Sequence, residues 1–403
     1  MVRALRFGLV LLLLTVPVGC YDNQPLKHAG IVMGTGIDKD EGEQGYTFSM
    51  EILRVGAGSG HAAGGTSLYG PRQSVVLRIQ ANDLFDAARN LIRFSKRRMF
   101  FTHNRVWIVS EKAARDNLVK IFDSVMRDQM LRMTSFLFVS KEAPEKVLTS
   151  STLLEKLTSL ELAAGVDALK YVGNFGQMYV MDFLEMMSGP VKAAYVPIIK
   201  IKEQSETTVT EISGIAIVKD DKMVGSLTQF ETFGLILLRG EVVGGWLHTS
   251  DKELTNQISI EIQSQKTKIT PRLENGSFAA DIDIQLRGTL ASVPPELDLK
   301  KPETIEKIER SAELWVKQVT VDTLRKLQKE YKADVINFGL QAYRKDPKSW
   351  KKVKDRWEEE FAEADISVNV NVDVYHMGLL NRSQGSIAEK PQHNPYRRFF
   401  KFH

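Results

Sequence analysis

The chain has one cysteine in 403 residues, Cys20, and this count limits how its fold can be held together. A single thiol cannot form a disulfide within the chain, so a folded body of this size depends on its apolar core. The same count excludes cysteine-based metal sites and cysteine–histidine catalysis in the body beyond residue 20. With 43% apolar and 26% charged residues, the composition is typical of a globular protein.

The position of Cys20 indicates a role for that thiol. Arg3 and Arg6 precede an apolar run over residues 7–18, which is too short to span a bilayer and has the layout of an export signal. A small residue followed at once by cysteine resembles a bacterial lipobox, although Pro17 stands where Leu is usual. We therefore expect residues 1–19 to be a lipoprotein signal peptide, with a cysteine in a signal cut elsewhere as the alternative. Cys20 would then carry a diacylglyceryl thioether and an N-acyl chain, enough for stable anchoring.

Length and pattern predict three domains after the signal peptide. The roughly 380 remaining residues correspond to about two or three domains. Strand and helix patterns alternate over residues 20–190, which predicts an N-terminal α/β domain. Residues 191–250 predict a small middle α+β domain, 251–380 a C-terminal α+β domain, and 381–403 a polar to basic-aromatic tail. The predicted fold class is α+β, or mixed α/β, with a mainly antiparallel or mixed sheet and flanking helices in each domain.

Local patterns predict particular elements. Asn82 or Asp83 would cap a helix with apolar residues at helical spacing, and residues 151–171 predict another helix. Residues 219–222 form a hairpin turn between two strand patterns, and a helix follows over 230–240. Residues 366–374 alternate strictly between aliphatic and polar side chains, so one side of this strand must face a core.

No run in the chain has the spacing of a catalytic or cofactor motif. The glycines within 34–40 lack the continuation of a dinucleotide site, and the acidic run 38–42 lacks the ligand order of a calcium loop. The seven histidines are scattered, with no two at metal-pair spacing. The glycine-rich segment 55–72 predicts a flexible surface loop, with nutrient or partner contact as the alternative. We expect no cofactor, no metal site and no enzymatic activity; a catalytic site of unrecognised pattern is the alternative.

Two basic stretches suggest surfaces rather than catalysis. Lys96, Arg97 and Arg98 end a predicted helix, where cations oppose the negative end of the dipole; contact with a partner or a lipid headgroup is the alternative. Residues 396–403 interleave basic and aromatic side chains, a composition typical of membrane interfaces, so we expect weak membrane contact, with a disordered tail as the alternative. The net charge of +4 gives no case for nucleic acid.

Five stretches together resemble a known family. They are GCYDNQPLKHAGIVMGTGIDKDEG (19–42), RRMFFTHNRVWIVSEKAARD (97–116), VMRDQMLRMTSFLFVSKEAPEKVL (125–148), SGIAIVKDDKMVGSLTQFETFGLILLRG (213–240) and INFGLQAYRKDPKSWKKVKDRWEEEFAEADISVNVNVDVYHMGLL (336–380). In order and content they are similar to the Ger(x)C lipoproteins, the C subunits of bacterial spore germinant receptors. The chain departs from the family at Tyr21, where Trp is usual, and at Pro17 in the lipobox.

The resemblance implies a non-catalytic receptor subunit in spore germination, lipid-anchored on the outer face of the spore inner membrane. Its implied partners are the integral membrane A and B subunits and the membrane lipid bound through Cys20, with no nucleic acid. The family has three mixed α/β domains. Only Cys20 carries over with a defined chemical role, and the resemblance leaves open whether the chain binds germinant itself.

Two other classes of function stay open on the sequence. A solute-binding lipoprotein that captures a small nutrient directly would normally have two similar lobes around a cleft, and the chain shows no obvious two-lobed repeat. A cell-wall enzyme anchored by lipid would need a catalytic site, and no motif for one is present.

Overall fold

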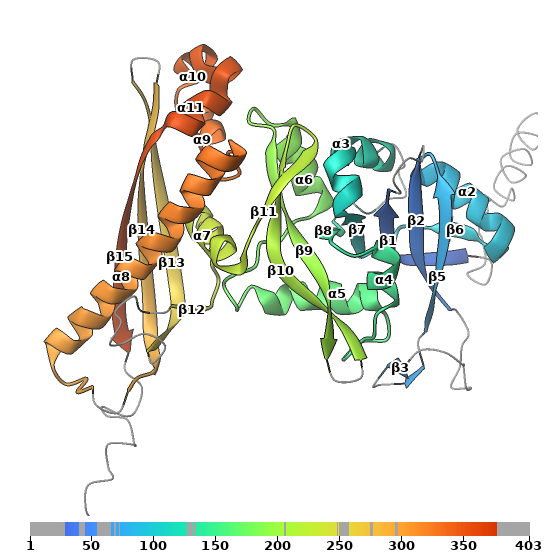
Figure 1. The fold of residues 1–403 in the computed structure, drawn as a ribbon, viewed down its shortest axis with the longest axis horizontal. Helices are drawn as coiled ribbons and strands as arrows, with labels where there is room; N and C mark the ends of the chain where they lie inside the picture. Colours follow the sequence, from blue (N-terminus) through green and yellow to red (C-terminus); the bar gives the residue numbers. More distant parts are fainter. Residues whose placement is uncertain are drawn as a thin grey trace, which may run out of the picture.

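A computed structural model describes residues 29–39, 45–54, 66–67, 70–71, 73–126, 132, 134–204, 207–247, 249, 258–274, 277–294 and 297–376. In these ranges the molecule is built on two large sheets with helices packed against them (Figure 1). Cys20, most of the glycine-rich segment 55–72 and the tail 381–403 lie outside them. What the sequence predicts for those segments therefore stays a prediction.

The larger sheet has nine strands. They are β1 (Ala29–Asp38), β2 (Tyr46–Leu53), β5 (Ser74–Ala81), β6 (Arg98–Phe100), β7 (Val106–Ser110), β8 (Phe136–Ser140), β9 (Ala193–Gln204), β10 (Thr207–Lys219) and β11 (Lys222–Leu227). Their order is β11-β10-β9-β8-β7-β1-β2-β5, with β6 pairing beside the start of β1. The central strands β9, β8, β7 and β1 are parallel, and antiparallel strands extend the sheet at both ends. A separate short pair joins β3 (Thr66–Ser67) to β4 (Gly70–Pro71).

Helices cover both faces of this sheet. One face carries α2 (Leu84–Ser95), α3 (Glu111–Met126) and α6 (Val180–Ser188), and the other carries α4 (Pro144–Thr149) and α5 (Thr158–Leu169). Strand β7 shows the division, because Trp107 and Val109 pack into the first core and Val106 and Ile108 into the second. A strand buried on both sides reads as a continuous apolar run, which is what residues 106–109 are.

The helix predicted over residues 151–171 is wrong in its first third. The helix α5 begins only at Thr158, and residues 150–157 are not helical. Its first N–H groups are capped from far away in the sequence, because the Glu51 carboxylate accepts from Thr158 N at 3.2 Å and Ser159 N at 2.9 Å. Glu51 lies on β2 and is fully buried, so the start of α5 is fixed by tertiary packing rather than by a local capping residue.

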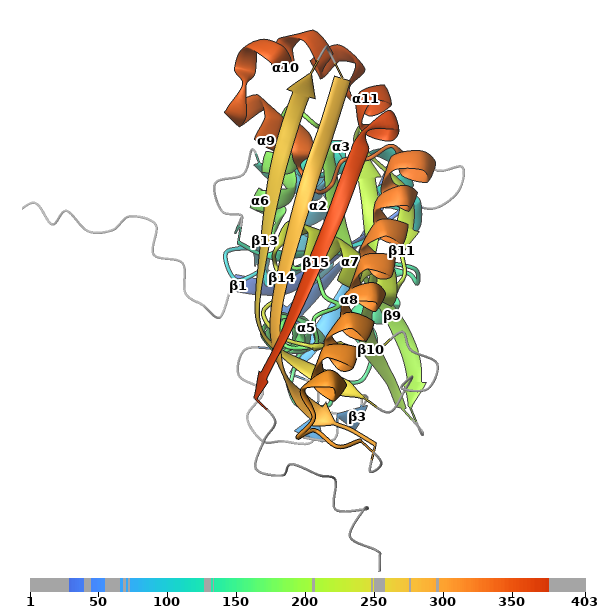
Figure 2. The ribbon, with the colours of Figure 1, turned by 90° about the vertical axis from the view of Figure 1, so that its left-hand side faces the viewer.

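The smaller sheet has four strands in the order β12-β13-β14-β15. They are β12 (Trp246–Leu247), β13 (Ser259–Glu274), β14 (Ser277–Ser292) and β15 (Asp365–His376), and Figure 2 shows the three long ones side by side with α8 along β15. The chain between β14 and β15 forms α8 (Pro302–Arg325), η2 (Lys326–Tyr331), α9 (Phe338–Lys345), α10 (Pro347–Val353), η3 (Lys354–Arg356) and α11 (Trp357–Glu363). This long connection lets β15 run parallel to β14.

The alternation predicted for the last strand is confirmed. Val368, Val372 and Val374 are buried, whereas Ser367 and Asn369 are exposed. Because β15 is an edge strand, its outer N–H groups need partners.

The helix α8 supplies partners for that edge. Glu313 accepts from Val372 N at 3.1 Å, and Glu309, four residues earlier on the same helix, accepts from Val374 N at 2.8 Å. Two carboxylates from one helix thus cover part of the free edge of the smaller sheet.

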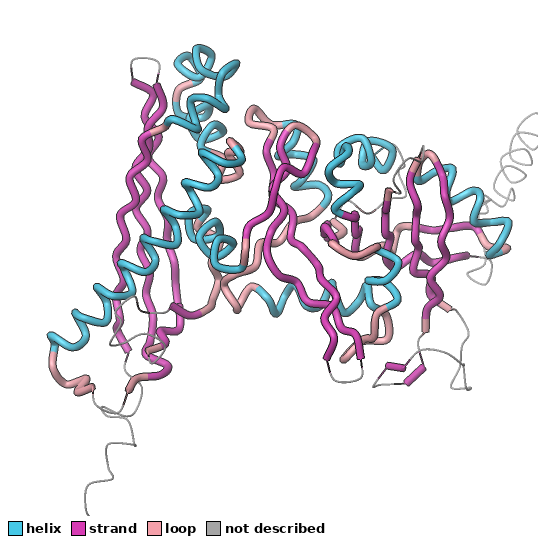
Figure 3. Tube along the Cα trace, viewed as in Figure 1, coloured by secondary structure: helices cyan, strands magenta, loops and turns pink. Residues whose placement is uncertain are grey.

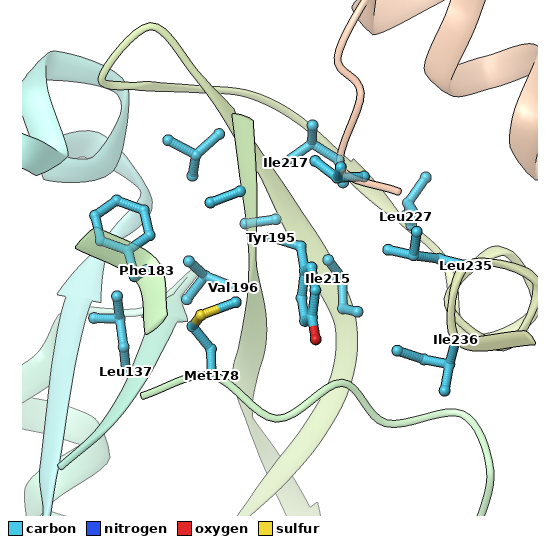
Figure 4. Packing of buried hydrophobic residues seen from close by; sticks show 14 of the residues in the cluster. Leu137, Met178, Phe183, Tyr195, Val196, Ile215, Ile217, Leu227, Leu235 and Ile236 are labelled. Carbon is cyan, nitrogen blue, oxygen red and sulfur yellow. The ribbon is translucent and has the colours of Figure 1, made fainter. Parts of the chain in front are cut away.

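The mixed α+β fold class is confirmed, and the division into three domains stays a prediction. At the predicted boundary near residue 190 the larger sheet is continuous, because β8 pairs with β9 through Val139 with Ile198 and Ser140 with Ile199 (Figure 3). Side chains from both sides of this boundary share one core, in which Leu137 of β8 and Ile217 of β10 are visible in Figure 4.

Candidate functional site

A cluster of polar side chains lies where α7 ends. This helix (Gln229–Arg239) begins with a reciprocal capping box between Thr228 and Glu231, and it ends at Gly240 in the left-handed region with φ 74°, as the sequence predicts. The sharp end of the helix brings Arg239 and Glu241 to the same side, where they meet the larger sheet.

Arg239, Glu241 and Tyr195 form a closed set of interactions. The guanidinium donates from Nε and Nη2 to Glu241 Oε1, each at 2.8 Å, and Tyr195 donates its hydroxyl to Glu241 Oε2 at 2.9 Å. The guanidinium carbon also lies 4.9 Å from the centre of the Tyr195 ring. Nη1 donates to the carbonyl of Val335, just before α9. The cluster therefore ties β9 of the larger sheet to the helical part of the C-terminal region.

The electrostatics of this cluster favour a structural role over proton transfer. Burial raises the pKa of the Tyr195 hydroxyl, so this group stays a neutral donor. Both carboxylate oxygens of Glu241 already accept hydrogen bonds. Nearby, burial together with the charges of Glu185 and Glu241 raises the pKa of Asp182. The three members of the cluster satisfy one another, which is typical of a structural joint.

Asp334 fixes the backbone beside this joint. Its buried carboxylate accepts from Phe338 N at 3.0 Å, Gly339 N at 2.8 Å and Trp357 Nε1 at 3.2 Å. It thus caps the start of α9 and holds α11 against it. Burial raises the pKa of Asp334 to about 7, although these N–H donors oppose the shift.

A second joint lies between α7, η2 and β11. Lys326 reaches both carboxylate oxygens of Glu231 at 3.0 and 3.1 Å, and Tyr331 donates its hydroxyl to the carbonyl of Ser226 at 2.9 Å. The Tyr331 ring lies directly over Gly225 of β11, where any side chain would meet it. The C-terminal helices are therefore attached to the larger sheet through these two joints, and also through the ion pair of Lys219 on β10 with Glu358 on α11 at 2.7 Å.

A cavity of about 510 Å³ opens beside the first joint. Its walls combine apolar side chains such as Phe175, Val191 and Leu340 with the charged Asp182 and Arg344. It lies where α6, β9, the end of α7 and α9 meet, and it is large enough for a small metabolite.

The residues singled out from the sequence have different outcomes. Cys20 and residues 396–403 lie outside the described residues. Lys96 ends α2 in the left-handed region with φ 57° and donates from Nζ to the Arg93 carbonyl at 2.6 Å, so the predicted helix-end role is confirmed. Among the described residues, no group of three His, Cys, Asp or Glu side chains is placed to hold a metal ion.

The glycines of residues 34–40 allow neighbouring helices to pack closely on β1. Gly34 and Gly36 lie within β1, and a Cβ at Gly36 would lie 2.5 Å from the Cβ of Pro144 on α4. The strand predicted for this run is confirmed, and the turn predicted after it lies in residues 40–44, outside the described residues. The sequence reasoning missed the Tyr195–Arg239–Glu241 joint, because Tyr195 comes from another element and the only local signal was Gly240 between two charged residues.

Each helix in the part of the chain that the structure describes falls short of the length and apolarity needed to cross a bilayer.

Comparison with known proteins matches both halves of the chain. The family described as "Spore germination protein N-terminal domain" matches residues 22–201, and that described as "Spore germination B3/GerAC like, C-terminal" matches residues 213–378. The two matches meet around the β9–β10 hairpin.

Relatives and a solved structure agree with these matches over most of their length. Spore germination protein KC of Bacillus subtilis (strain 168) is 26% identical, covering 92% of this chain and 96% of the relative. Spore germination protein B3 of the same organism is 25% identical, covering 95% and 100%. The crystal structure of the GerBC protein superposes with a TM-score of 0.56 at 20% identity, covering 85% of this chain and 96% of that one. The chain belongs to the Ger(x)C family of spore germination proteins.

Proposed function

We propose that this chain is the lipid-anchored, non-catalytic C subunit of a nutrient germinant receptor. It would lie on the outer face of the spore inner membrane and act as a scaffold and signalling partner for the integral membrane A and B subunits. The observation that carries the proposal is the match of both halves of the chain to spore germination families, in order and at nearly full length.

The anchor would act through confinement. Eight residues separate Cys20 from Ala29, where β1 begins, so a lipid on Cys20 holds the start of the sheet within about 30 Å of the bilayer even if the linker is fully extended. Such tethering raises the effective concentration of the body at its membrane partners without any new contact.

The joint between the sheets supports the scaffold role over an enzymatic one. Arg239 and Glu241 bond to each other and to Tyr195, and the fully buried Asp334 is held by three N–H donors. A general base or nucleophile needs a free partner directed at a substrate, whereas these groups are directed at each other.

The direct test replaces the lipidated thiol. Cys20→Ala should release the protein from the membrane fraction, lower the amount of assembled receptor and slow the nutrient-induced fall in optical density of purified spores. The matched control is Pro17→Leu, which restores the usual lipobox residue and should keep or increase lipidation, read by mass spectrometry of the mature N-terminus. A Cys20→Ala protein that is soluble but gives normal receptor levels and normal germination would refute the anchored scaffold.

Deletion of the whole gene tests whether the protein acts in the response of spores to nutrients. Deletion spores should lose the response to one set of nutrients and keep the response to a trigger that bypasses nutrient receptors. Loss of both responses would point to a general defect in the spore rather than to a receptor.

The cavity favours a second candidate, direct capture of a small nutrient. Its charged and apolar walls suit a small zwitterion, but the two sheets of the molecule are dissimilar, unlike the paired lobes expected of a solute-binding lipoprotein. Calorimetric titration with amino acids and sugars separates the two. Val243 lines the cavity and is half-exposed, so Val243→Trp should block binding without unfolding the protein if this second candidate is correct.

A further inference from the structure

The outer side of α2 is an exposed apolar and basic surface, which we call the α2 face. It consists of Phe85, Arg89, Ile92 and Arg93 on the helix, with Lys96 at its C-terminal end and Arg97 and Arg98 just after it. Leu84, Ala87 and Leu91 point into the core. At about 100° per residue, Phe85, Arg89, Ile92 and Lys96 therefore line one stripe on the opposite side.

The apolar side chains of the α2 face are unusually exposed. Phe85 is 56% exposed and Ile92 40%. The Arg89 guanidinium lies over the Phe85 ring, 4.3 Å from its centre, and so shares the same patch of surface. Large apolar groups grouped in this way indicate a contact surface.

The α2 face carries an excess of positive charge. It holds five cations, namely Arg89, Arg93, Lys96, Arg97 and Arg98. None of the five forms an ion pair with a carboxylate within the part of the chain that the structure describes. The two aspartates nearby are engaged at the start of the helix, since Asp83 accepts from Asp86 N and Asp86 accepts from the Asn90 amide.

The α2 face also lies where the described chain begins. Ala29, the first residue of β1, pairs with Arg98, and Gly30 pairs with Met99. The end of the linker from Cys20 is therefore beside this surface. Figure 1 shows α2 at one end of the molecule and β13 to β15 at the opposite end. The last described strand, β15, also lies at that far end.

We propose that the α2 face docks on an anionic phospholipid bilayer. The inference rests on the proposed anchor at Cys20 and adds a second contact that sets how the body meets the membrane. Arg and Lys side chains bind headgroup phosphates, while the Phe85 ring and Ile92 enter the interfacial layer. Among the described residues these cations lack a carboxylate partner. They lie beside the exposed Phe85 and Ile92, at the end of the body that the anchor would hold nearest to the lipid, and so fit a bilayer in charge and position.

The first experiment measures binding without the lipid. The mature chain, residues 20–403 with Cys20→Ala, is mixed with vesicles of phosphatidylcholine alone or with equal parts of phosphatidylglycerol, and bound protein is measured by co-sedimentation. Binding should require phosphatidylglycerol and weaken as salt is added. Each Lys or Arg near such a surface contributes about fivefold, so Arg89→Gln, Arg93→Gln and Lys96→Gln together should weaken binding about a hundredfold.

A matched control separates the effect of the α2 face from the effect of lowering the net charge of the protein. Lys266→Gln, Lys268→Gln and Lys351→Gln remove three exposed cations from the C-terminal region and should change binding only slightly. Equal losses in the two triple variants would overturn the proposal, and so would a mature chain that does not bind vesicles at all. Circular dichroism confirms that both variants are folded.

The second experiment identifies the contacting face. Because Cys20 is the only cysteine, the Cys20→Ala chain accepts a single label at Ile92→Cys or at Lys268→Cys. An environment-sensitive fluorophore at position 92 should shift to the blue on anionic vesicles, whereas the one at 268 should not.

The remaining outcomes are also decisive. A shift at 268 instead of 92 would place the contact elsewhere. If the α2 triple variant binds vesicles normally but lowers co-purification of the A and B subunits, the α2 face is a protein interface and the lipid proposal is wrong. None of these results depends on lipidation of Cys20, so the proposed anchor can fail or stand independently.

Discussion

The crossing of α7 and α8 gives the sharpest test of how the two sheets are joined. At Gly234 the helices approach so closely that a Cβ would meet Thr323 Oγ1 and lie 2.9 Å from the carbonyl oxygen of Val319. The second of these neighbours is backbone and cannot rotate away. Gly234→Ala must therefore push the helices apart or distort one of them.

The expected cost follows from three effects. Alanine is favoured over glycine inside a helix by about 1 kcal/mol, which lowers the cost. Overpacking of a close contact costs about 1–3 kcal/mol. The Thr323 hydroxyl donates to Val319 O at 2.8 Å and is also within 3.2 Å of Glu231 O, so moving it loses about 1 kcal/mol of hydrogen bonding. We expect Gly234→Ala to lower the free energy of unfolding by about 2 kcal/mol.

Gly165 provides a matched control. It lies within α5, and a Cβ there would meet nothing within 4 Å. Gly165→Ala has the same helical gain without the steric cost, so it should raise the free energy of unfolding by about 0.5–1 kcal/mol. The same chemical change is therefore expected to have opposite signs at the two positions.

Urea unfolding followed by tryptophan fluorescence measures both variants. Trp315 of α8 packs on Phe233 with ring centres 5.7 Å apart, so it reports on this crossing. Adding Thr323→Ala to Gly234→Ala should recover part of the loss, because one of the two obstructing groups is removed. If Gly234→Ala is as stable as Gly165→Ala, the close approach of α7 and α8 is not present and the reasoning is refuted.

Three further predictions concern buried and edge groups. Glu241→Ala leaves the Arg239 side chain, only 13% exposed, without its carboxylate and should lower the free energy of unfolding by about 3 kcal/mol. Arg239→Met leaves the Glu241 carboxylate, which is 40% exposed, and should lower it by less. Equal losses of unfolding free energy in urea titration would contradict the buried pairing. Burial raises the pKa of Asp334 to about 7, so its stabilising contribution is complete below about pH 4 and is lost as the pH rises through 7. Asp334→Asn should remove this fall in unfolding free energy, and the same slope in both proteins between pH 4 and pH 7 would show that this carboxylate does not titrate there. Glu309→Ala combined with Glu313→Ala frees two N–H groups of an edge strand and should increase self-association in light scattering, whereas unchanged scattering would show that the edge needs no cover.

Elements whose signals lie within a dozen residues could be predicted from the sequence. Asp83 caps α2 by accepting from Asp86 N at 2.8 Å, as its position before an amphipathic run indicates. Asp220 and Asp221 adopt φ 46° and 73° in the β10–β11 hairpin turn, a geometry that aspartate tolerates. The alternation of residues 366–374 likewise follows from one buried face.

The contacts that place these elements in space could not be predicted, because they join residues far apart in the chain. Glu51 caps a helix that begins at Thr158, and β15 pairs in parallel with β14 only after the long helical connection over 302–363. Neither contact leaves a local sequence pattern. In the sequence, a glutamate that will be buried cannot be distinguished from one that will lie on the surface. The cavity and the Tyr195–Glu241 bond have the same origin, as products of tertiary packing.

An anchor and a docking face together would fix both the distance and the orientation of the body relative to the bilayer. A lipid on Cys20 limits distance, but a linker that reaches about 30 Å leaves the body free to rotate. Contact through the α2 face would remove most of that freedom, because α2 is at one end of the long axis of the molecule (Figure 1). The continuous larger sheet and the two polar joints would then transmit this orientation to the smaller sheet. The smaller sheet, the cavity and α9 would face away from the bilayer, where extramembrane parts of the receptor subunits could reach them.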